Sequence, residues 1–192
     1  EVKNVKKLLI LNQHSPVVSE LLPLLDESDE ISYRIFQGDI QSAGDYVTAL
    51  SGVDWLLSAL GPEDVDLDFE ELFDAIDQAA PKIQHFVMLS YAGIDDELKS
   101  PMVFPEVKNR QEFIKQQRYA IKIVDESEIP YSIIRMSSLT DGKRSDYQLF
   151  NEGNKMSVGS VSAKNVADLI FDAFVNQKLI NHSVGIMDSG ND

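Results

Sequence analysis

The chain contains no cysteine, and this absence removes several kinds of chemistry at once. Disulfide bonds, thiol nucleophiles and zinc–thiolate sites are all excluded. Basic residues are also scarce, since 17 Lys and Arg stand against 32 Asp and Glu, for a net charge of −15. Without a basic excess to release counterions, we expect neither nucleic acid nor an anionic membrane as a partner. No apolar run is long enough to cross a bilayer and no signal peptide is visible, so we expect a cytoplasmic protein.

The remaining composition is that of a globular domain. The chain has 192 residues, of which 43% are hydrophobic, which is enough for one domain with a sizeable core. We therefore expect a single domain over residues 1–192. The histidines lie far apart, at positions 14, 85 and 182, without the spacing of metal ligands. We accordingly expect no metal site.

Short apolar runs alternate with helix-like patterns along the chain. Runs of this length suit strands buried on both faces, and they predict strands at 7–11, 31–36, 54–60, 83–90, 131–136 and 183–187. Helices are predicted at Val17–Leu25, Ala43–Leu50, Phe69–Ala80, Pro105–Glu126 and Ser162–Asn176, the last with Ser162 as N-cap. This alternation predicts an α/β fold, a doubly wound, mainly parallel sheet with helices on both faces.

The first strand, turn and helix have the layout of a dinucleotide-binding unit, but the glycines are missing. In such a unit, glycines let backbone N–H groups approach a pyrophosphate at the helix N-terminus. Here the turn offers Asn12, Ser15 and Val18 instead. Asn12 tolerates left-handed backbone angles, Ser15 can cap the helix with its own oxygen, and Pro16 has no N–H to donate. The turn is compatible with a phosphate site and equally with a self-capped helix that binds nothing.

Ligands of an open parallel sheet bind beyond the C-terminal ends of the strands. The sequence places segments 12–16, 38–40, 59–62, 90–93 and 136–139 at that edge. Trp55, the only tryptophan, is also expected near it.

The segments that follow these strands resemble one known family in consistent order. They are GDI (38–40), GVDWLLSALG (52–61), VMLSYAG (87–93), YSIIRMSSLTDG (131–142) and VSAKNVADLIFDAF (161–174). Together they resemble the atypical short-chain dehydrogenases/reductases, in particular the NmrA-like branch of NAD(P)-binding epimerases and oxidoreductases. The resemblance implies a Rossmann-like domain over the whole chain and NAD(P) as the cofactor.

The resemblance also implies roles for individual positions. Ser90 matches a serine near the nicotinamide and is the candidate catalytic residue. The residues implied in cofactor binding are those of the first turn, those around the adenine and those along the ribose and phosphates: Asn12, Ser15, Pro16, Val17, Asp39, Ile40, Ala59, Leu60, Gly61 and Ser90.

The chain departs from the family at its catalytic pair and in its length. Phe113 and Gln117 stand where the family has the Tyr and Lys that relay a proton, and no such pair occurs elsewhere. Tyr91 and Tyr119 are the candidate substitutes for the tyrosine. Only a few residues separate Leu25 from the next strand, so we expect one strand–helix unit to be absent after the first helix.

Three functions remain open at this stage. The first is an NAD(P)-binding oxidoreductase or epimerase of unknown substrate, and the second is a non-catalytic NmrA-like module that regulates or binds another protein. The third is a structural subunit that pairs with an active homologue. We expect NAD(P) binding to be weak or absent, because the turn, the adenosine side and the catalytic pair are altered together. A dinucleotide or other small molecule, a second copy of the chain and a protein partner are the candidate partners.

Overall fold

The computed structural model describes residues 4–12, 14–102, 104 and 106–190. Its helices are α1 (Pro16–Asp26), α2 (Ala43–Ala49), α3 (Val65–Ala79), α4 (Arg110–Glu126) and α5 (Ala163–Val175). Its strands are β1 (Lys6–Asn12), β2 (Ile31–Ile35), β3 (Trp55–Ala59), β4 (His85–Tyr91), β5 (Tyr131–Met136), β6 (Ser138–Thr140), β7 (Tyr147–Asn151), β8 (Ser160–Ser162) and β9 (His182–Asp188).

The fold is built on one large sheet with the strand order β2-β1-β3-β4-β5-β9-β7. All neighbours in it run parallel except β7, which pairs antiparallel with β9. The central strands β3 and β4 are buried along almost their whole length, as their continuous apolar sequences require. This confirms the predicted Rossmann-like α/β sheet.

Among the described residues, one strand, β2, flanks β1 on its outer side. The standard dinucleotide-binding order, 3-2-1-4-5-6, has two strands in that place. The sheet therefore lacks one strand–helix unit after α1, as the short connection predicted.

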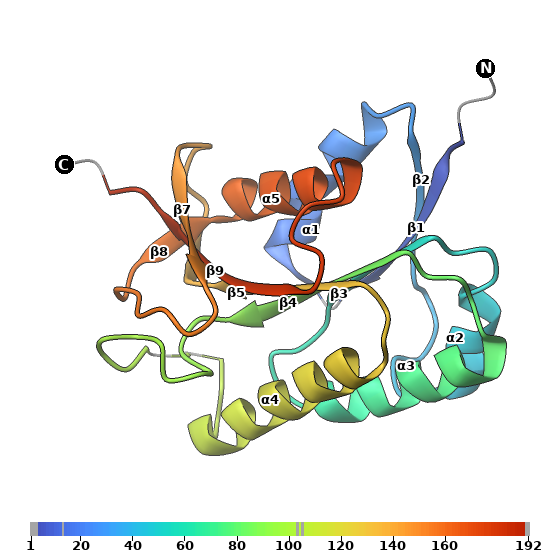
Figure 1. Cartoon of the computed structure of the whole chain (residues 1–192), viewed down its shortest axis with the longest axis horizontal. Coiled ribbons are helices and arrows are strands. Elements are labelled where there is room, and N and C mark those ends of the chain that lie inside the picture. The colour runs from blue at the N-terminus through green and yellow to red at the C-terminus, as the bar shows by residue number, and fades with distance from the viewer. Residues whose placement is uncertain (1–3, 13, 103, 105, 191–192) are drawn as a thin grey trace.

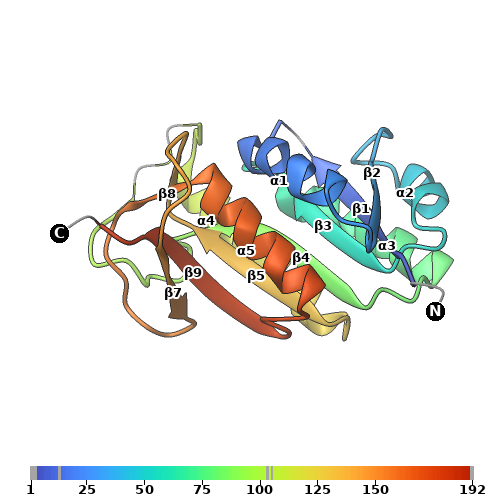
Figure 2. The same ribbon diagram turned by 90° about the horizontal axis from the view of Figure 1, so that it is seen from above.

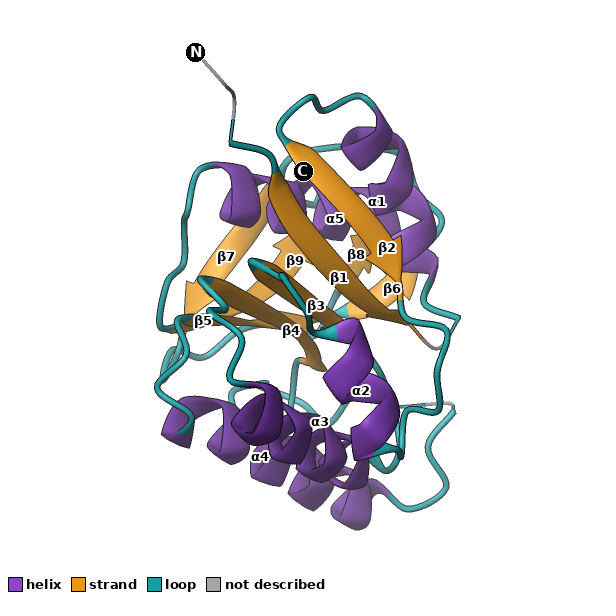
Figure 3. Cartoon of the chain, turned by 90° about the vertical axis from the view of Figure 1, so that its right-hand side faces the viewer, coloured by secondary structure: helices purple, strands orange, loops and turns teal. Residues whose placement is uncertain are grey.

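Helices cover both faces of the sheet. Figure 1 shows α1 and α5 above it and α2, α3 and α4 below it, and Figure 3 shows the same layers from the side. Each face has its own apolar core: α1 and α5 pack on β1 and β3, and α2, α3 and α4 pack on the opposite side. Seen from above, α1 and α5 lie next to each other, with β2 and β7 at opposite edges of the sheet (Figure 2).

Two helix starts differ from the prediction by more than one residue. The helix α3 begins at Val65, four residues before the predicted start at Phe69. The predicted start of the next helix, Pro105, lies outside the described residues, and α4 begins only at Arg110. The Asn109 side chain fixes that start, because it accepts a hydrogen bond of 3.2 Å from the Glu112 amide.

The strands β6, β7 and β8 were not predicted. The strands β6 and β8 are three residues long and pair only with each other, and β7 is a half-exposed edge strand. Such segments carry no continuous apolar run. In the described part of the chain, no helix combines the length and apolarity that a bilayer crossing needs.

Candidate functional site

A cavity of about 400 Å³ lies at the C-terminal ends of β1, β3, β4 and β5. This is the edge where the topology of a parallel sheet places ligands. Its wall is mostly apolar and consists of His14, Ser15, Pro16, Ala59, Leu60, Gly61, Pro62, Leu89, Tyr91, Met102, Phe104, Glu106, Val107, Met136, Ser137, Ser138 and Leu139.

The cavity brings together part of the predicted cofactor site. The predicted residues that line it are Ser15, Pro16, Ala59, Leu60 and Gly61. The others, Asn12, Val17, Asp39, Ile40 and Ser90, are not part of its wall.

The turn before α1 is closed by Asn12. Its Oδ1 accepts a hydrogen bond of 2.8 Å from the Ser15 amide, and the left-handed residue is His14, with φ 63°, and not Asn12. Ser15 is the N-cap residue by backbone angles, but among the described residues its side chain makes no capping hydrogen bond. The predicted self-cap by Ser15 is therefore wrong, because the Asn12 side chain stabilises the turn instead.

Two of the remaining residues lie in the loop after β2. Asp39 is exposed, and its Oδ1 accepts a hydrogen bond of 2.9 Å from the Gln41 amide. The Ile40 carbonyl accepts one of 2.7 Å from the hydroxyl of the buried Tyr46. The side chain of Val17 is fully buried in the core under α1. These contacts order the loop and the helix.

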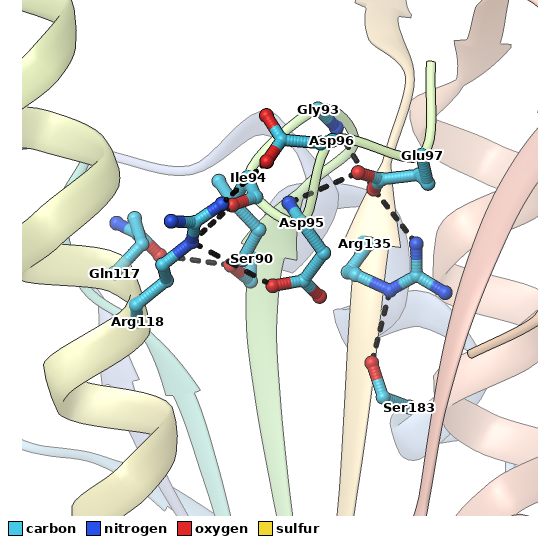
Figure 4. A network of polar contacts seen from close by, with 10 residues as sticks. All are labelled: Ser90, Gly93, Ile94, Asp95, Asp96, Glu97, Gln117, Arg118, Arg135 and Ser183. Atoms are coloured by element: carbon cyan, nitrogen blue, oxygen red, sulfur yellow. Dashed lines mark hydrogen bonds and ion pairs between the residues drawn. The ribbon is translucent and has the colours of Figure 1, made fainter. Parts of the chain in front are cut away.

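Ser90 and Gln117 form a closed, fully buried pair. The Ser90 hydroxyl donates to Gln117 Oε1 over 2.9 Å, and Gln117 Nε2 donates to the Pro62 carbonyl over 3.0 Å. Both side chains are 0% exposed. Figure 4 shows Ser90 at the end of β4, directed at Gln117 on α4. The pair ties β4, α4 and the loop after β3 together.

Phe113, which the sequence resemblance matches to the family's tyrosine, belongs to an aromatic cluster under the cavity. Its ring lies 5.3 Å from that of Tyr91 and 4.7 Å from that of Phe104, measured between centroids. Tyr91 and Phe104 line the cavity, whereas Phe113 is buried behind them. Phe113 thus orients two cavity rings.

Neither candidate substitute for the tyrosine has the properties of a proton relay. Burial, followed by the charge of Glu106, raises the pKa of the Tyr91 hydroxyl to about 12. A relay tyrosine needs the opposite, a pKa lowered by a neighbouring cation. Tyr119 is 47% exposed on α4 and lies outside the cavity wall.

The loop after β4 is anchored by a buried ion pair that the sequence did not predict. Arg135 Nη1 lies 2.7 Å from Glu97 Oε1, with both side chains at most 3% exposed. Glu97 also accepts hydrogen bonds from the Gly93 and Asp95 amides, and Arg135 donates to Ser183 (Figure 4). The signal for it was a charged residue inside the apolar run YSIIRM, because a buried arginine needs a partner.

Trp55 does not lie near the cavity. It occupies the first position of β3, whose last residue, Ala59, is the one that lines the cavity. Its ring stacks on Phe174 of α5, with centroids 5.2 Å apart. The wall residues that sequence reasoning missed include Met102, Phe104, Glu106 and Val107, where the sequence has no periodic pattern.

The start of α1 has fewer free N–H groups for the pyrophosphate of a dinucleotide than a glycine-rich turn has. The Ser15 amide is already engaged by Asn12, and Pro16 has no N–H. Among the described residues of the cavity wall there is no lysine or arginine to contact phosphate. Arg34 on β2 donates instead to the carbonyls of Ala49 and Ser51. These residues do not fit a pyrophosphate.

Comparisons with known proteins agree on the class of the fold. A family model described as NAD(P)H-binding matches residues 23–177. A Rossmann-fold NAD(P)-binding family protein from Shigella flexneri has a TM-score of 0.77 at 21% identity, over 98% of both chains. A search of the curated proteins found no match.

Two further structures carry chemical descriptions. A wide-type short-chain dehydrogenase/reductase from Veillonella parvula, in complex with NADP, has a TM-score of 0.73 at 18% identity, over 96% of this chain and 95% of that one. ChuY, an anaerobillin reductase from Escherichia coli, has a TM-score of 0.78 at 17% identity, over 97% and 99%. At these identities the likeness shows the fold alone.

Proposed function

The chain belongs to the NAD(P)H-binding family, and from that premise we propose that it is a ligand-binding member without Tyr–Lys-dependent catalysis. It keeps the Rossmann-like sheet and a cavity at the ligand-binding edge. The observation that carries the proposal is the buried hydrogen bond between Ser90 and Gln117. The residues at the family's catalytic positions serve there as structural contacts.

The chemistry of those positions supports the proposal. In the family's oxidoreductases and epimerases, the tyrosine exchanges a proton with the substrate, and the lysine lowers the tyrosine pKa. Phe113 has no exchangeable proton. Gln117 has no charge, and its Oε1 and Nε2 atoms both hold protein partners. The Ser90 proton is donated to Gln117, so it is not presented to a ligand in the cavity.

The electrostatics support weak binding of NAD(P). A dinucleotide brings a diphosphate, and NADP brings a further phosphate. The chain carries a net charge of −15, and the described cavity wall has Glu106 but no lysine or arginine. The negative charge of the protein repels the phosphates, and the Ser15 amide is not free to donate to them because it donates to Asn12.

A reductase that transfers hydride directly is the second candidate. It needs no Tyr–Lys pair, and the segment 59–62 after β3 lines the cavity where the family places the ribose and phosphates. Gly61, with φ 102°, keeps the left-handed turn there. The NADP complex of the Veillonella parvula protein is consistent with this candidate only by analogy. It requires NADPH to bind well at neutral pH.

Calorimetric titration of NADPH and of NADH separates the two candidates. Calorimetry is preferred to tryptophan fluorescence because Trp55 lies at the far end of β3. We expect a Kd above about 1 mM for both nucleotides, which is roughly 4 kcal/mol of binding free energy. A Kd of about 10 µM or tighter would overturn the proposal and favour the direct reductase.

A variant with a rebuilt turn shows which element limits nucleotide binding. Asn12→Gly, Ser15→Gly and Val18→Gly together restore the glycine pattern. A gain in NADPH affinity would identify the first turn as the limit. No gain would point to the adenosine side, where the sheet is one strand shorter.

A further inference from the structure

The cavity has a shape and a surface suited to a compact apolar ligand. Its volume of about 400 Å³ lies at the lower end of the range for small-molecule sites. Leu60, Met102 and Met136 are buried side chains of its wall. A ligand there gains most of its affinity from apolar contact.

Two aromatic rings form part of this wall in a fixed arrangement. Tyr91 and Phe104 meet edge to face, with centroids 6.2 Å apart. Phe113 packs against both of them from behind, at 5.3 and 4.7 Å. Aromatic rings attract a cation that comes within about 6 Å of the ring centroid.

The charge around the cavity is negative. Glu106 is the only Asp or Glu among the described wall residues, and none of those residues is a lysine or arginine. Its charge acts on the cavity, because after burial it is the second cause that raises the pKa of the Tyr91 hydroxyl. His14, also in the wall, is exposed. A cation is favoured at neutral pH and an anion is disfavoured.

We propose that this cavity binds a compact aromatic or branched alkyl ammonium ion. Its apolar body lies against Tyr91 and Phe104, and Glu106 supplies the opposite charge. The inference rests on the proposed function, because a tightly bound dinucleotide would occupy the same space.

Three small aromatic compounds that differ in charge test the ligand class. The probes are benzylammonium, benzyl alcohol and benzoate, titrated into the whole protein at pH 7.5 and followed by calorimetry or NMR. We expect benzylammonium to bind with a Kd below about 1 mM and about tenfold more tightly than the alcohol, which is 1.4 kcal/mol. Benzoate binds most weakly.

Two variants that each remove one carboxylate test whether Glu106 supplies the charge that attracts the ligand. Glu106→Gln should weaken benzylammonium about tenfold and leave benzyl alcohol unchanged. Glu112 is exposed like Glu106 but lies outside the cavity wall, so Glu112→Gln removes the same charge and should change neither Kd by more than about twofold.

Each contrary result has a distinct meaning. Stronger binding of the alcohol or of benzoate, no binding of benzylammonium at 10 mM (roughly ten times the expected Kd), or equal effects of the two variants would overturn the ammonium proposal. A parallel titration with NADPH separates this from failure of the proposed function. A micromolar Kd for NADPH overturns the proposed function, whereas a millimolar Kd leaves it standing and confines the failure to the ligand class.

Discussion

The ion pair between Arg135 and Glu97 allows a quantitative prediction. The two side chains are 1% and 3% exposed, so each charge depends on the other. Replacing Arg135 with Met keeps most of the volume but leaves the Glu97 carboxylate buried with only the Gly93 and Asp95 amides as donors. Breaking a buried pair in this way typically destabilises a protein by about 3–5 kcal/mol. That is a large part of the about 5–15 kcal/mol that usually stabilises a domain.

The sign of the pH dependence follows from Glu97. Burial raises the pKa of Glu97, but the hydrogen bond from the Gly93 amide and the contacts with Arg135 outweigh burial and lower it overall. A lowered carboxyl pKa stabilises the fold above the pKa of the unfolded state, and this stabilisation is lost as the pH falls through the folded-state pKa. In Arg135→Met, part of this acid-labile stabilisation should already be absent at pH 7.

Urea unfolding at pH 7 measures the effect against an internal control. Arg118 forms an exposed ion pair with Asp96 in the same loop, at 3.3 Å, and Arg118→Met should lower the free energy of unfolding by less than about 1 kcal/mol. Adding Glu97→Gln to Arg135→Met should recover part of the loss, because the uncompensated charge disappears. The reasoning would be refuted if Arg135→Met were no more destabilising than Arg118→Met.

Three smaller predictions concern stability. Burial lowers the pKa of His85 to about 4, so the unfolded state binds the proton more readily than the folded state. The free energy of unfolding therefore falls as the pH drops from about 6.5 to 4, and His85→Gln should reduce this pH dependence. Burial raises the pKa of Asp68 to about 6, so its ionisation at pH 7 opposes folding by about 3 kcal/mol. Asp68→Asn should therefore raise the urea midpoint of unfolding at pH 7, and a lower midpoint would contradict this. Ser15→Ala should change the free energy of unfolding little, because the Ser15 side chain makes no capping hydrogen bond. Ser162→Ala should lower it by about 1 kcal/mol, because Ser162 Oγ accepts a hydrogen bond of 3.0 Å from the Asn165 amide. Thermal unfolding measures both.

The strands and helices that pack into the core could be predicted from the sequence. The run KLLIL fills β1, and the side chain of Ser162 caps α5 as expected. Ser15 occupies an equally good cap position, yet the Asn12 oxygen binds its amide and its own hydroxyl makes no cap. Local sequence indicates which residues can cap a helix, but the conformation of the turn decides which of them does.

The candidate site could be predicted only in part. The edge of the sheet that holds the cavity could be predicted from the strand ends, whereas the match of Phe113 and Gln117 to the family's tyrosine and lysine stays a prediction. The contact that gives Gln117 its role joins it to Ser90, 27 positions away, and depends on how α4 packs against β4. Around Phe104 and Glu106 the sequence has no periodic pattern, so their contribution to the cavity wall became visible only in the structure.

We propose that Ser90 and Gln117 serve as structural contacts, and the free energy of unfolding of Ser90→Ala is the measurement that tests this role. Removing the hydroxyl leaves Gln117 Oε1 buried without its donor, so the account predicts a loss of about 1–3 kcal/mol in urea unfolding at pH 7. A free energy of unfolding within about 0.5 kcal/mol of the wild type, as for ordinary surface substitutions, would contradict the account.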